Sequence, residues 1–304
     1  MAATVIDGNA LAAELSDRVG RDLEQLKVTG SVPGLATVLV GDDPAAAAYE
    51  RHVTRLAERL GCEYTNERLP IGSEVADVLA VVGKLNADPR VTGILVLRPM
   101  PKGIAEPPIN AALDPYKDVE AVHPENAGLL AQGRPRFVPS TPASCYYLLD
   151  AYLRSTDREP VAFYPGKTLV VVGRSDSVGK PAASLGLQRN ATVVTCHSQT
   201  ADLGAFTRQA DVLIVAAGVA GLVGGDMVKE GVIAIDVGID PVEDPETGKV
   251  TFVGDIDFDS VAAKAEAITP VPGGVGPVTD VWLIGNAVSA AAAALRVEPR
   301  FGVT

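Results

Sequence analysis

The sequence predicts an α/β protein with parallel sheets and two domains. Short apolar runs recur between helical or loop segments, at 35–40, 93–96, 169–172, 192–195, 212–216 and 232–237. Parallel strands that are covered on both faces have this continuous apolar character. The chain has 304 residues, more than one folding unit usually holds, so two hydrophobic cores are expected.

The composition is that of a folded protein, and it narrows the classes of partner. Apolar residues make up 47% and charged residues 21% of the chain, and the net charge is −12. This charge repels phosphate backbones and anionic lipid, so neither nucleic acid nor a membrane surface is an expected partner. Three scattered cysteines and three histidines predict no disulfide framework and no metal site.

The termini and hydropathy indicate the compartment. The chain begins without a basic segment followed by an apolar run, and it has no stretch of eighteen apolar residues. We therefore expect no export signal and no membrane span. Together with the cysteine usage, this favours a cytoplasmic protein.

The first half alternates helix and strand. Apolar residues three to four apart predict an amphipathic helix over 7–26, with Asp7 as its N-cap. The strand 35–40 ends in a Gly-Asp-Asp-Pro turn, and a second helix is expected over 45–60. The stretch 99–142 contains nine prolines and has little periodicity, which predicts a long crossover with a domain boundary near its end.

The second half carries four of the predicted strands and then a loop-like stretch over 269–279. An alanine-rich helix follows over 281–295. This order suggests that the chain returns to the first domain at its end. The predicted domains are therefore 1–142 completed by 280–304, and 143–279.

A glycine-bearing turn follows the strand 169–172 and leads into a helix. Gly173 allows a sharp turn and Gly179 allows close packing of helix on strand, while the helix N-terminus offers N–H groups to a pyrophosphate. Ser175 occupies the place of the usual middle glycine. The pattern favours a dinucleotide site, with an ordinary turn of a parallel sheet as the alternative.

The end of the next strand, 192–195, indicates which dinucleotide. NAD sites have an acidic residue there for the ribose 2′-hydroxyl, and this chain has none. Ser198 and Arg174 suit a 2′-phosphate instead, so NADP is predicted. The alternative is that Arg174 is a solvated turn cation and Ser198 a helix cap.

Several motifs then point to one family. The sequences GKTLVVVGRSDSVGKP, NATVVTCHSQT, IDVGID, VGDIDF and TPVPGGVGPVT follow one another, after VGDDPAAAAYERHV, GILVLRPMPKGI and DPYKDVEAVHPENAGLL. Over nearly its whole length the chain resembles the bifunctional methylenetetrahydrofolate dehydrogenase/cyclohydrolase family of one-carbon metabolism. The resemblance implies an N-terminal α/β folate domain, a Rossmann-like NADP-binding domain, a C-terminal helix returning to the first domain, and a folate cleft between the domains.

The resemblance also implies substrates, assembly and cofactor contacts. The substrates are tetrahydrofolate derivatives, and the protein is expected to be a homodimer through the NADP domain. The implied cofactor-binding residues are spread over four turns: Gly173, Arg174, Ser175, Ser177, Val178, Gly179, His197, Ser198, Ala217, Gly218, Val237, Gly238 and Ile239.

The folate site departs from the family pattern. The family's cyclohydrolase chemistry uses a Tyr-x-x-x-Lys pair, a glutamine and an aspartate. Tyr49 matches the tyrosine, but the other three positions hold Val53, Leu97 and Glu120. Tyr49 and Glu120 are the expected catalytic residues, and the implied substrate-binding residues are Tyr49, Val53, Leu97, Pro99, Glu120, Pro272, Gly273 and Gly274.

These departures are expected to impair the cyclohydrolase activity more than the dehydrogenase activity. Hydration of the methenyl cation needs groups that carry protons, and valine and leucine cannot. Hydride transfer needs mainly positioning of donor and acceptor. We therefore predict an NADP-dependent dehydrogenase whose cyclohydrolase activity is weak or lost; a fully bifunctional enzyme and a non-catalytic nucleotide-binding paralogue are the alternatives.

Three roles stay open at this stage. Tyr49 has apolar helical neighbours, so packing in the core is the alternative to lining the folate site. Glu120 either binds the aminopyrimidine edge of the pterin through hydrogen bonds or is a surface carboxylate in a loop. Arg98 is either solvated or contacts the glutamate tail of the substrate.

Overall fold

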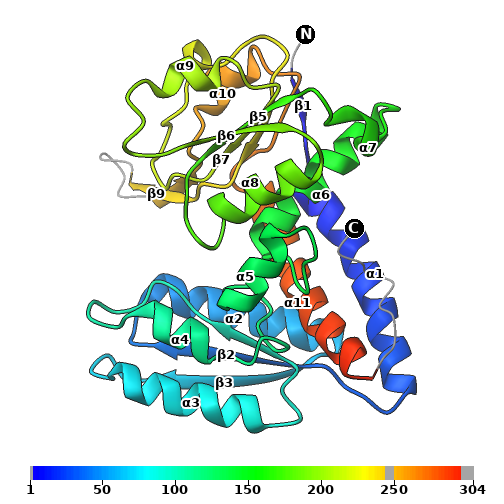
Figure 1. Ribbon diagram of the computed structural model, residues 1–304, viewed down its shortest axis with the longest axis vertical. Helices are drawn as coiled ribbons and strands as arrows, with labels where there is room; N and C mark the ends of the chain where they lie inside the picture. Colours follow the sequence, from blue (N-terminus) through cyan, green and yellow to red (C-terminus); the bar gives the residue numbers. More distant parts are fainter. Residues whose placement is uncertain (1–2, 244–249, 296–304) are drawn as a thin grey trace. The chain divides into compact units, whose positions relative to one another are not determined.

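The computed structural model describes residues 3–243 and 250–295 (Figure 1). Its contacts divide the described chain into two compact units. One consists of residues 3–13, 141–243 and 250–279, and the other of residues 14–140 and 280–295. The last nine residues of the predicted C-terminal return, 296–304, lie outside the described residues.

The N-terminal segment differs from the sequence-based division. Strand β1 (Thr4–Val5) pairs in parallel with β11 (Ala267–Ile268), so residues 3–13 belong with 141–279 and not with the unit that follows them. A strand of two residues has no periodicity to reveal it. The later boundaries fall at 140/141 and 279/280, against the predicted 142/143 and 279/280.

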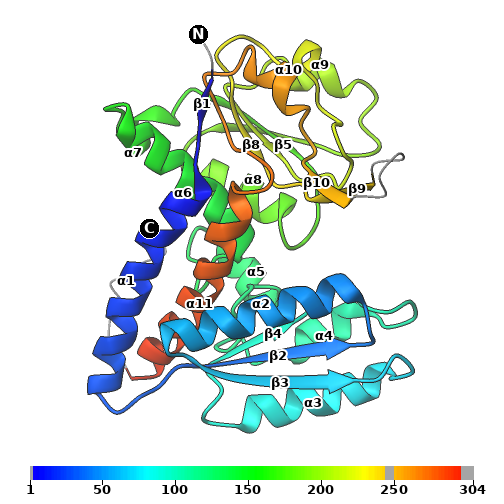
Figure 2. The same cartoon turned by 180° about the vertical axis from the view of Figure 1, so that it is seen from behind.

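The first unit contains a six-stranded sheet in the order β1-β11-β8-β7-β5-β6. Figures 1 and 2 label its strands β1, β5, β6, β7 and β8. All its strand pairs are parallel, as predicted. The remaining strands are β5 (Thr168–Val172), β6 (Thr192–Cys196), β7 (Val212–Val215) and β8 (Ile233–Asp236).

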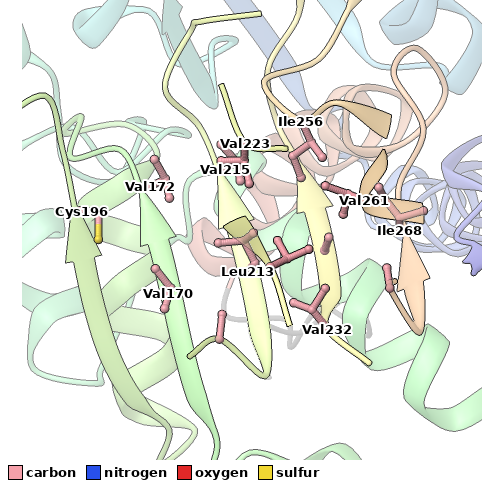
Figure 3. Close-up of a cluster of buried hydrophobic side chains, with 14 residues drawn as sticks. Val170, Val172, Cys196, Leu213, Val215, Val223, Val232, Ile256, Val261 and Ile268 are labelled. Carbon is pink, nitrogen blue, oxygen red and sulfur yellow. The ribbon is translucent and has the colours of Figure 1, made fainter. Parts of the chain in front are cut away.

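A cluster of buried valine, leucine and isoleucine side chains lies on this sheet (Figure 3). Val170, Leu213 and Ala234 come from adjoining strands and expose none of their surface. β-branched and aliphatic residues suit such buried strands, and burying each large side chain contributes about 2 kcal/mol. The sheet is thereby a rigid base for the loops at its carboxyl edge.

Helices and short elements connect these strands. In the first unit they are α6 (Ser140–Ser155), α7 (Pro160–Phe163), α8 (Gly179–Gln188), α9 (Leu203–Thr207), η1 (Gly225–Met227) and α10 (Phe258–Ala262), with the antiparallel pair β9 (Asp240–Glu243) and β10 (Val250–Val253).

The second unit contains a three-stranded parallel sheet in the order β3-β2-β4, formed by β2 (Gly34–Val40), β3 (Glu63–Leu69) and β4 (Gly93–Val96). Its helices are α2 (Pro44–Leu60), α3 (Val75–Ala87), α4 (Glu106–Ala112) and α5 (Pro124–Ala131). Two long helices, α1 (Gly8–Val28) and α11 (Val275–Ala294), continue from one unit into the other.

Helix starts follow the predicted local chemistry. The Asp7 carboxylate accepts the Asn9 N–H at 2.9 Å and so caps α1, as the sequence predicts. Asp43 caps α2 in the same way, accepting the Ala46 N–H at 2.8 Å, and Pro44 occupies the first turn of α2. Among the described helices, none is both long and apolar enough to cross a membrane.

Candidate active site

The residues predicted to bind a cofactor lie at the carboxyl edge of the six-stranded sheet. Val172 pairs with Cys196 on one side and with Val215 on the other, so the turns after β5, β6 and β7 adjoin. The turn after β8 follows next, because Val215 pairs with Asp236. These four turns carry Gly173 to Gly179, His197 and Ser198, Ala217 and Gly218, and Val237 to Ile239.

The turn after β5 has no room for side chains at its two glycines. A Cβ on Gly173 would lie 2.2 Å from the Ala216 carbonyl oxygen, and its φ of +128° favours glycine. A Cβ on Gly179 would lie 2.3 Å from the Gly173 carbonyl oxygen. The chain crosses from one side of β5 to the other after β6, so this turn lies at the switch point where open α/β sheets bind nucleotides.

Polar groups surround this turn. Ser175 Oγ accepts the N–H groups of Val178 at 3.2 Å and Gly179 at 3.3 Å, holding the start of α8 in place. Arg174 and Ser198 are both exposed on adjoining turns, since the Gly173 N–H donates to the Cys196 carbonyl at 2.9 Å. Basic and hydroxyl groups in this arrangement can bind a phosphate. The geometry therefore fits NADP.

Two buried aspartates brace the other turns, and the sequence analysis missed their role. Asp255 accepts three N–H groups, from Ala217 at 2.6 Å, Gly218 at 3.1 Å and Val219 at 2.7 Å. Asp236 accepts the N–H groups of Gly238 and Asp255, both at 3.0 Å. Both carboxylates lie in quoted motifs, IDVGID and VGDIDF, but a motif does not reveal which backbone groups they meet.

Burial raises the pKa of Asp236 to about 6, although hydrogen bonds from backbone N–H groups act in the opposite direction. The ionised form is the one that accepts these bonds. Asp236 and Asp255 therefore stabilise the turns rather than react.

The predicted folate loop before α11 belongs to this same unit. The Gly8 N–H donates to the Gly273 carbonyl at 2.9 Å, which ties the start of α1 to the loop. Gly273 has φ +103°, and a Cβ on Gly274 would lie 2.5 Å from the Pro270 carbonyl oxygen. Pro272 follows a cis peptide bond.

Tyr49 is positioned in the second unit by the buried residue that follows it on α2. Glu50 accepts hydrogen bonds from the Tyr64 hydroxyl at 3.0 Å and from Arg68 at 2.6 Å, both on β3. Although burial raises the pKa of Glu50, these hydrogen bonds outweigh it and lower the pKa. The helix is thus fixed to the sheet, with Tyr49 half-buried.

The positions where the family carries lysine and glutamine are apolar and buried. Val53 exposes none of its surface and Leu97 exposes 3%. Pro99 is exposed and follows a cis peptide bond from Arg98. Arg98 itself donates to Glu106 at 2.7 Å and forms an ion pair with it.

Glu120 has a buried carboxyl group with one free acceptor. Its Oε2 accepts the Ser140 N–H at 3.2 Å, and its Oε1 is buried without a hydrogen-bond partner among the described residues. Burial raises the pKa of Glu120 to about 7. A buried oxygen without a partner, on a carboxyl group that titrates near neutrality, is characteristic of a ligand-binding position.

The loop that carries Glu120 is held by its neighbours. Asp118 is fully buried and accepts the N–H groups of Val122 at 3.1 Å and His123 at 2.8 Å, and the Asn126 amide at 2.8 Å. Lys117 donates to three carbonyl groups at the end of α3, which stabilises that helix end. These two residues of the DPYKDVEAVHPENAGLL motif therefore position Glu120.

The structure also brings two residues that the sequence analysis did not assign to this site against Tyr49. Asp280, on α11, accepts a hydrogen bond from the Tyr49 hydroxyl and pairs with His52 Nε2 at 2.8 Å. Loss of solvation raises the pKa of Tyr49 well above its usual value, and the carboxyl groups of Asp280 and Glu120 raise it further. Tyr49 is therefore part of a polar cluster and not of the apolar core.

Fold and turns together define a dinucleotide-binding α/β protein. Residues 6–120 match the family model of the tetrahydrofolate dehydrogenase/cyclohydrolase catalytic domain, and residues 139–295 match that of its NAD(P)-binding domain. The chain belongs to the tetrahydrofolate dehydrogenase/cyclohydrolase family. This confirms the resemblance found in the sequence.

Individual relatives agree. Bifunctional protein FolD 3 of Rubrobacter xylanophilus is 63% identical over 95% of this chain and 92% of its own length. The bifunctional FolD enzyme of Campylobacter jejuni is 40% identical with a TM-score of 0.89, covering 96% of this chain and all of its own. The Trypanosoma brucei FolD enzyme, solved with NADP and an inhibitor, is 33% identical with a TM-score of 0.89 over 98% and 100% of the two chains.

Within the described ranges, no group of three or more histidine, cysteine, aspartate or glutamate side chains is placed to hold a metal ion. The three cysteines are free and buried. Neither observation adds a catalytic group to those described above.

Proposed function

We propose that the chain is an NADP-dependent 5,10-methylenetetrahydrofolate dehydrogenase with weak or absent methenyltetrahydrofolate cyclohydrolase activity. Family membership supports the folate substrate, and the turn after β5, with Gly173 and Gly179, supports the cofactor. The observation that carries the loss of hydration is the complete burial of Val53, an apolar side chain where the family carries its lysine.

The NADP residues have distinct tasks in this proposal. The turn after β5 presents the N-terminus of α8 to the pyrophosphate, and Arg174 with Ser198 binds the 2′-phosphate. Asp255 and Asp236 hold the turns after β7 and β8 against the cofactor. When bound, NADP supplies the hydride acceptor.

The folate residues bind and orient in this proposal. The Glu120 carboxylate, with its free Oε1, accepts N–H groups from the aminopyrimidine edge of the pterin. Tyr49 contacts the folate through its ring and hydroxyl, and Pro99 contributes apolar surface, whereas the buried side chains of Val53 and Leu97 offer little or none. Pro272, Gly273 and Gly274 bind the folate through their backbone.

Purified protein tests the proposal directly. Adding methylenetetrahydrofolate and NADP should produce NADPH and methenyltetrahydrofolate in equal amounts. Methenyltetrahydrofolate should then decline only at the rate seen in buffer without protein. Absence of NADPH would instead indicate the non-catalytic paralogue.

A bifunctional enzyme is the second candidate function, and the contact between Tyr49, Asp280 and His52 favours it. The three side chains form a hydrogen-bonded series, so a proton could pass along them. The bifunctional naming of the 63% identical relative also supports it. Methenyl consumption well above the buffer rate would establish this second function.

Two further proposals concern the setting. We propose a homodimer through the NADP domain, because β6 is an edge strand with exposed residues available for contact. Light scattering measures the mass of the assembly.

We also propose a cytoplasmic location, because the three buried thiols suit a reducing compartment. Fractionation of cells tests this location.

A further inference from the structure

A carboxylate on α11 reaches Tyr49 from a second helix. Asp280 accepts a hydrogen bond from the Tyr49 hydroxyl and lies 2.8 Å from His52 Nε2. The Asp280 side chain is 15% exposed and that of His52 is 52% exposed. Tyr49 and His52 are three residues apart on α2, so both side chains reach Asp280 from one helix face.

The charges around Tyr49 differ from those that the resemblance implies. The resemblance implies an ammonium group on the residue four after the tyrosine, and this chain has buried Val53 there. The charged groups that act on the Tyr49 hydroxyl are instead the carboxyls of Asp280 and Glu120. In this chain the tyrosine therefore has carboxyl groups beside it and no ammonium group at position 53.

The surrounding groups do not neutralise these carboxyl groups. His52 is the partner of Asp280, and it lies on the exposed side of the pair. Glu120 is influenced by Asp118, another carboxyl, and by Arg98, whose guanidinium is paired with Glu106. Carboxyl groups therefore outnumber free cations around Tyr49 among the described residues.

We propose that Asp280 stabilises the positive charge that dehydrogenation creates on the folate, and that it determines which product the enzyme releases. This rests on the proposed function, since it takes Tyr49 to line the folate site. In that reaction a C–H bond of the methylene bridge breaks and its electron pair leaves as hydride to oxidised NADP. A nitrogen lone pair then forms the second bond to this carbon, leaving the methenyl cation.

The same carboxylate opposes hydration. Water that attacks the methenyl carbon loses a proton, and the adduct carries no positive charge. A carboxylate that favours the cation therefore stabilises the reactant of hydration more than its product, and the barrier to hydration rises. Asp280 thus favours dehydrogenation and disfavours hydration through one interaction.

Asp280→Asn tests this by removing the charge while keeping the shape. The inhibition constant of freshly added methenyltetrahydrofolate, from initial rates, should rise about tenfold, the effect of one charge across a partly exposed site. The KM of methylenetetrahydrofolate, which lacks this cation, should change less than twofold. Asp17→Asn makes the same chemical change on an exposed face of α1 and should leave both constants unchanged.

Asp280→Glu separates charge from packing. It keeps the carboxylate, so the methenyl inhibition constant should return to within about threefold of the original protein. If Asp280 only packs α11 against α2, the glutamate variant will be as impaired as the asparagine variant, and the substrate and product constants will shift together. Either result overturns the proposal. Melting temperatures of both variants identify any loss of folding.

The outcomes distinguish this inference from the proposed function. Unchanged methenyl affinity in Asp280→Asn, with methenyl accumulating from the original protein, overturns the inference alone. Rapid hydration by the original protein that becomes faster still in Asp280→Asn, with the tenfold affinity loss also seen, overturns the proposed function alone. Rapid hydration that Asp280→Asn abolishes shows that Asp280 carries protons, and both are then wrong.

Discussion

Arg174 is an exposed side chain on which the proposed preference for NADP depends. It stands in the turn after β5, beside the turn that carries Ser198, and no acidic residue ends β6. The same features in the sequence predicted NADP, because they depend only on residue type at a strand end. The structure adds that the two turns adjoin.

Arg174→Ala should reduce kcat/KM for NADP about tenfold, because one charge-assisted contact to the 2′-phosphate contributes on the order of 1–3 kcal/mol. The value for NAD should change little, so the preference narrows. Arg154→Ala, an exposed arginine on α6, is the matched control. Retention of the full NADP preference in Arg174→Ala would assign the 2′-phosphate to other residues.

Glu120 predicts a pH dependence. Burial raises the pKa of Glu120 to about 7, and in the proposed function the ionised form accepts the pterin N–H groups. The KM of methylenetetrahydrofolate should therefore increase as pH falls below about 7, by up to tenfold per pH unit. The KM of NADP serves as the internal control, and Glu120→Gln should show a high KM that varies little with pH.

The same group predicts the pH dependence of stability, with a definite sign. The pKa of Glu120 is higher in the folded protein than in the unfolded chain. Its contribution to stability is therefore full below the pKa that the same carboxyl group has in the unfolded chain, and it is lost as pH rises through about 7. As pH rises from about 5 to about 8, the free energy of unfolding should therefore fall less for Glu120→Gln than for the original protein. Urea unfolding at each pH measures this.

At the scale of elements, sequence patterns located the buried strands well and the polar ones poorly. The apolar runs predicted β2, β4, β5, β6, β7 and β8 to within two residues. Strand β3 was missed because its sequence, EYTNERL, is polar and half-exposed at the edge of its sheet. Its position depends on pairing with β2, which local sequence does not show.

Helices in the proline-rich stretch were also missed. Helices α4 and α5 lie within 99–142, where a loop was expected, and both begin with proline in the first turn. Proline is tolerated there because the first N–H groups of a helix need no partner within it. Similarly, α11 begins at Val275, within the predicted loop 269–279, and has Pro277 in its first turn, where proline is tolerated.

The loop between α4 and α5 makes its own prediction. Asp118→Ala removes the acceptor for the Val122 and His123 N–H groups and for the Asn126 amide. Leaving these donors buried without partners should lower the free energy of unfolding by about 3 kcal/mol. Urea unfolding measures this, with Asp17→Ala as the exposed control; a loss below about 1 kcal/mol would show that the loop holds without Asp118.

At the scale of the whole molecule, the residues that distinguish this chain come from separate parts of the sequence. Val53 and Leu97 could be recognised by comparison of motifs. Asp280 could not, because it lies in the apolar segment VTDVWLIGN and its partners are more than two hundred residues away. Only folding brings α2 and α11 together around Tyr49, so the contact of Asp280 with Tyr49 could not be predicted from the sequence.

Which of two reactions the molecule performs should depend on these residues as a set. Val53→Lys alone places an ammonium group where no surface is exposed and where Leu97 offers no partner. We expect it to cost about 3 kcal/mol of stability and to restore little hydration. Val53→Lys with Leu97→Gln should restore measurable cyclohydrolase activity beyond the sum of the single variants, because the two groups act as one hydrogen-bonded unit.

Asp280→Asn should increase this restored activity further, since it removes the carboxylate that stabilises the methenyl cation. Loss of methenyl absorbance above the buffer rate measures hydration, and NADPH formation in the same samples controls for folding and folate binding. Equal hydration by the double and triple variants would limit the role of Asp280 to dehydrogenation. No hydration in any variant, with NADPH formation intact, would show that Val53 and Leu97 are not what prevents it.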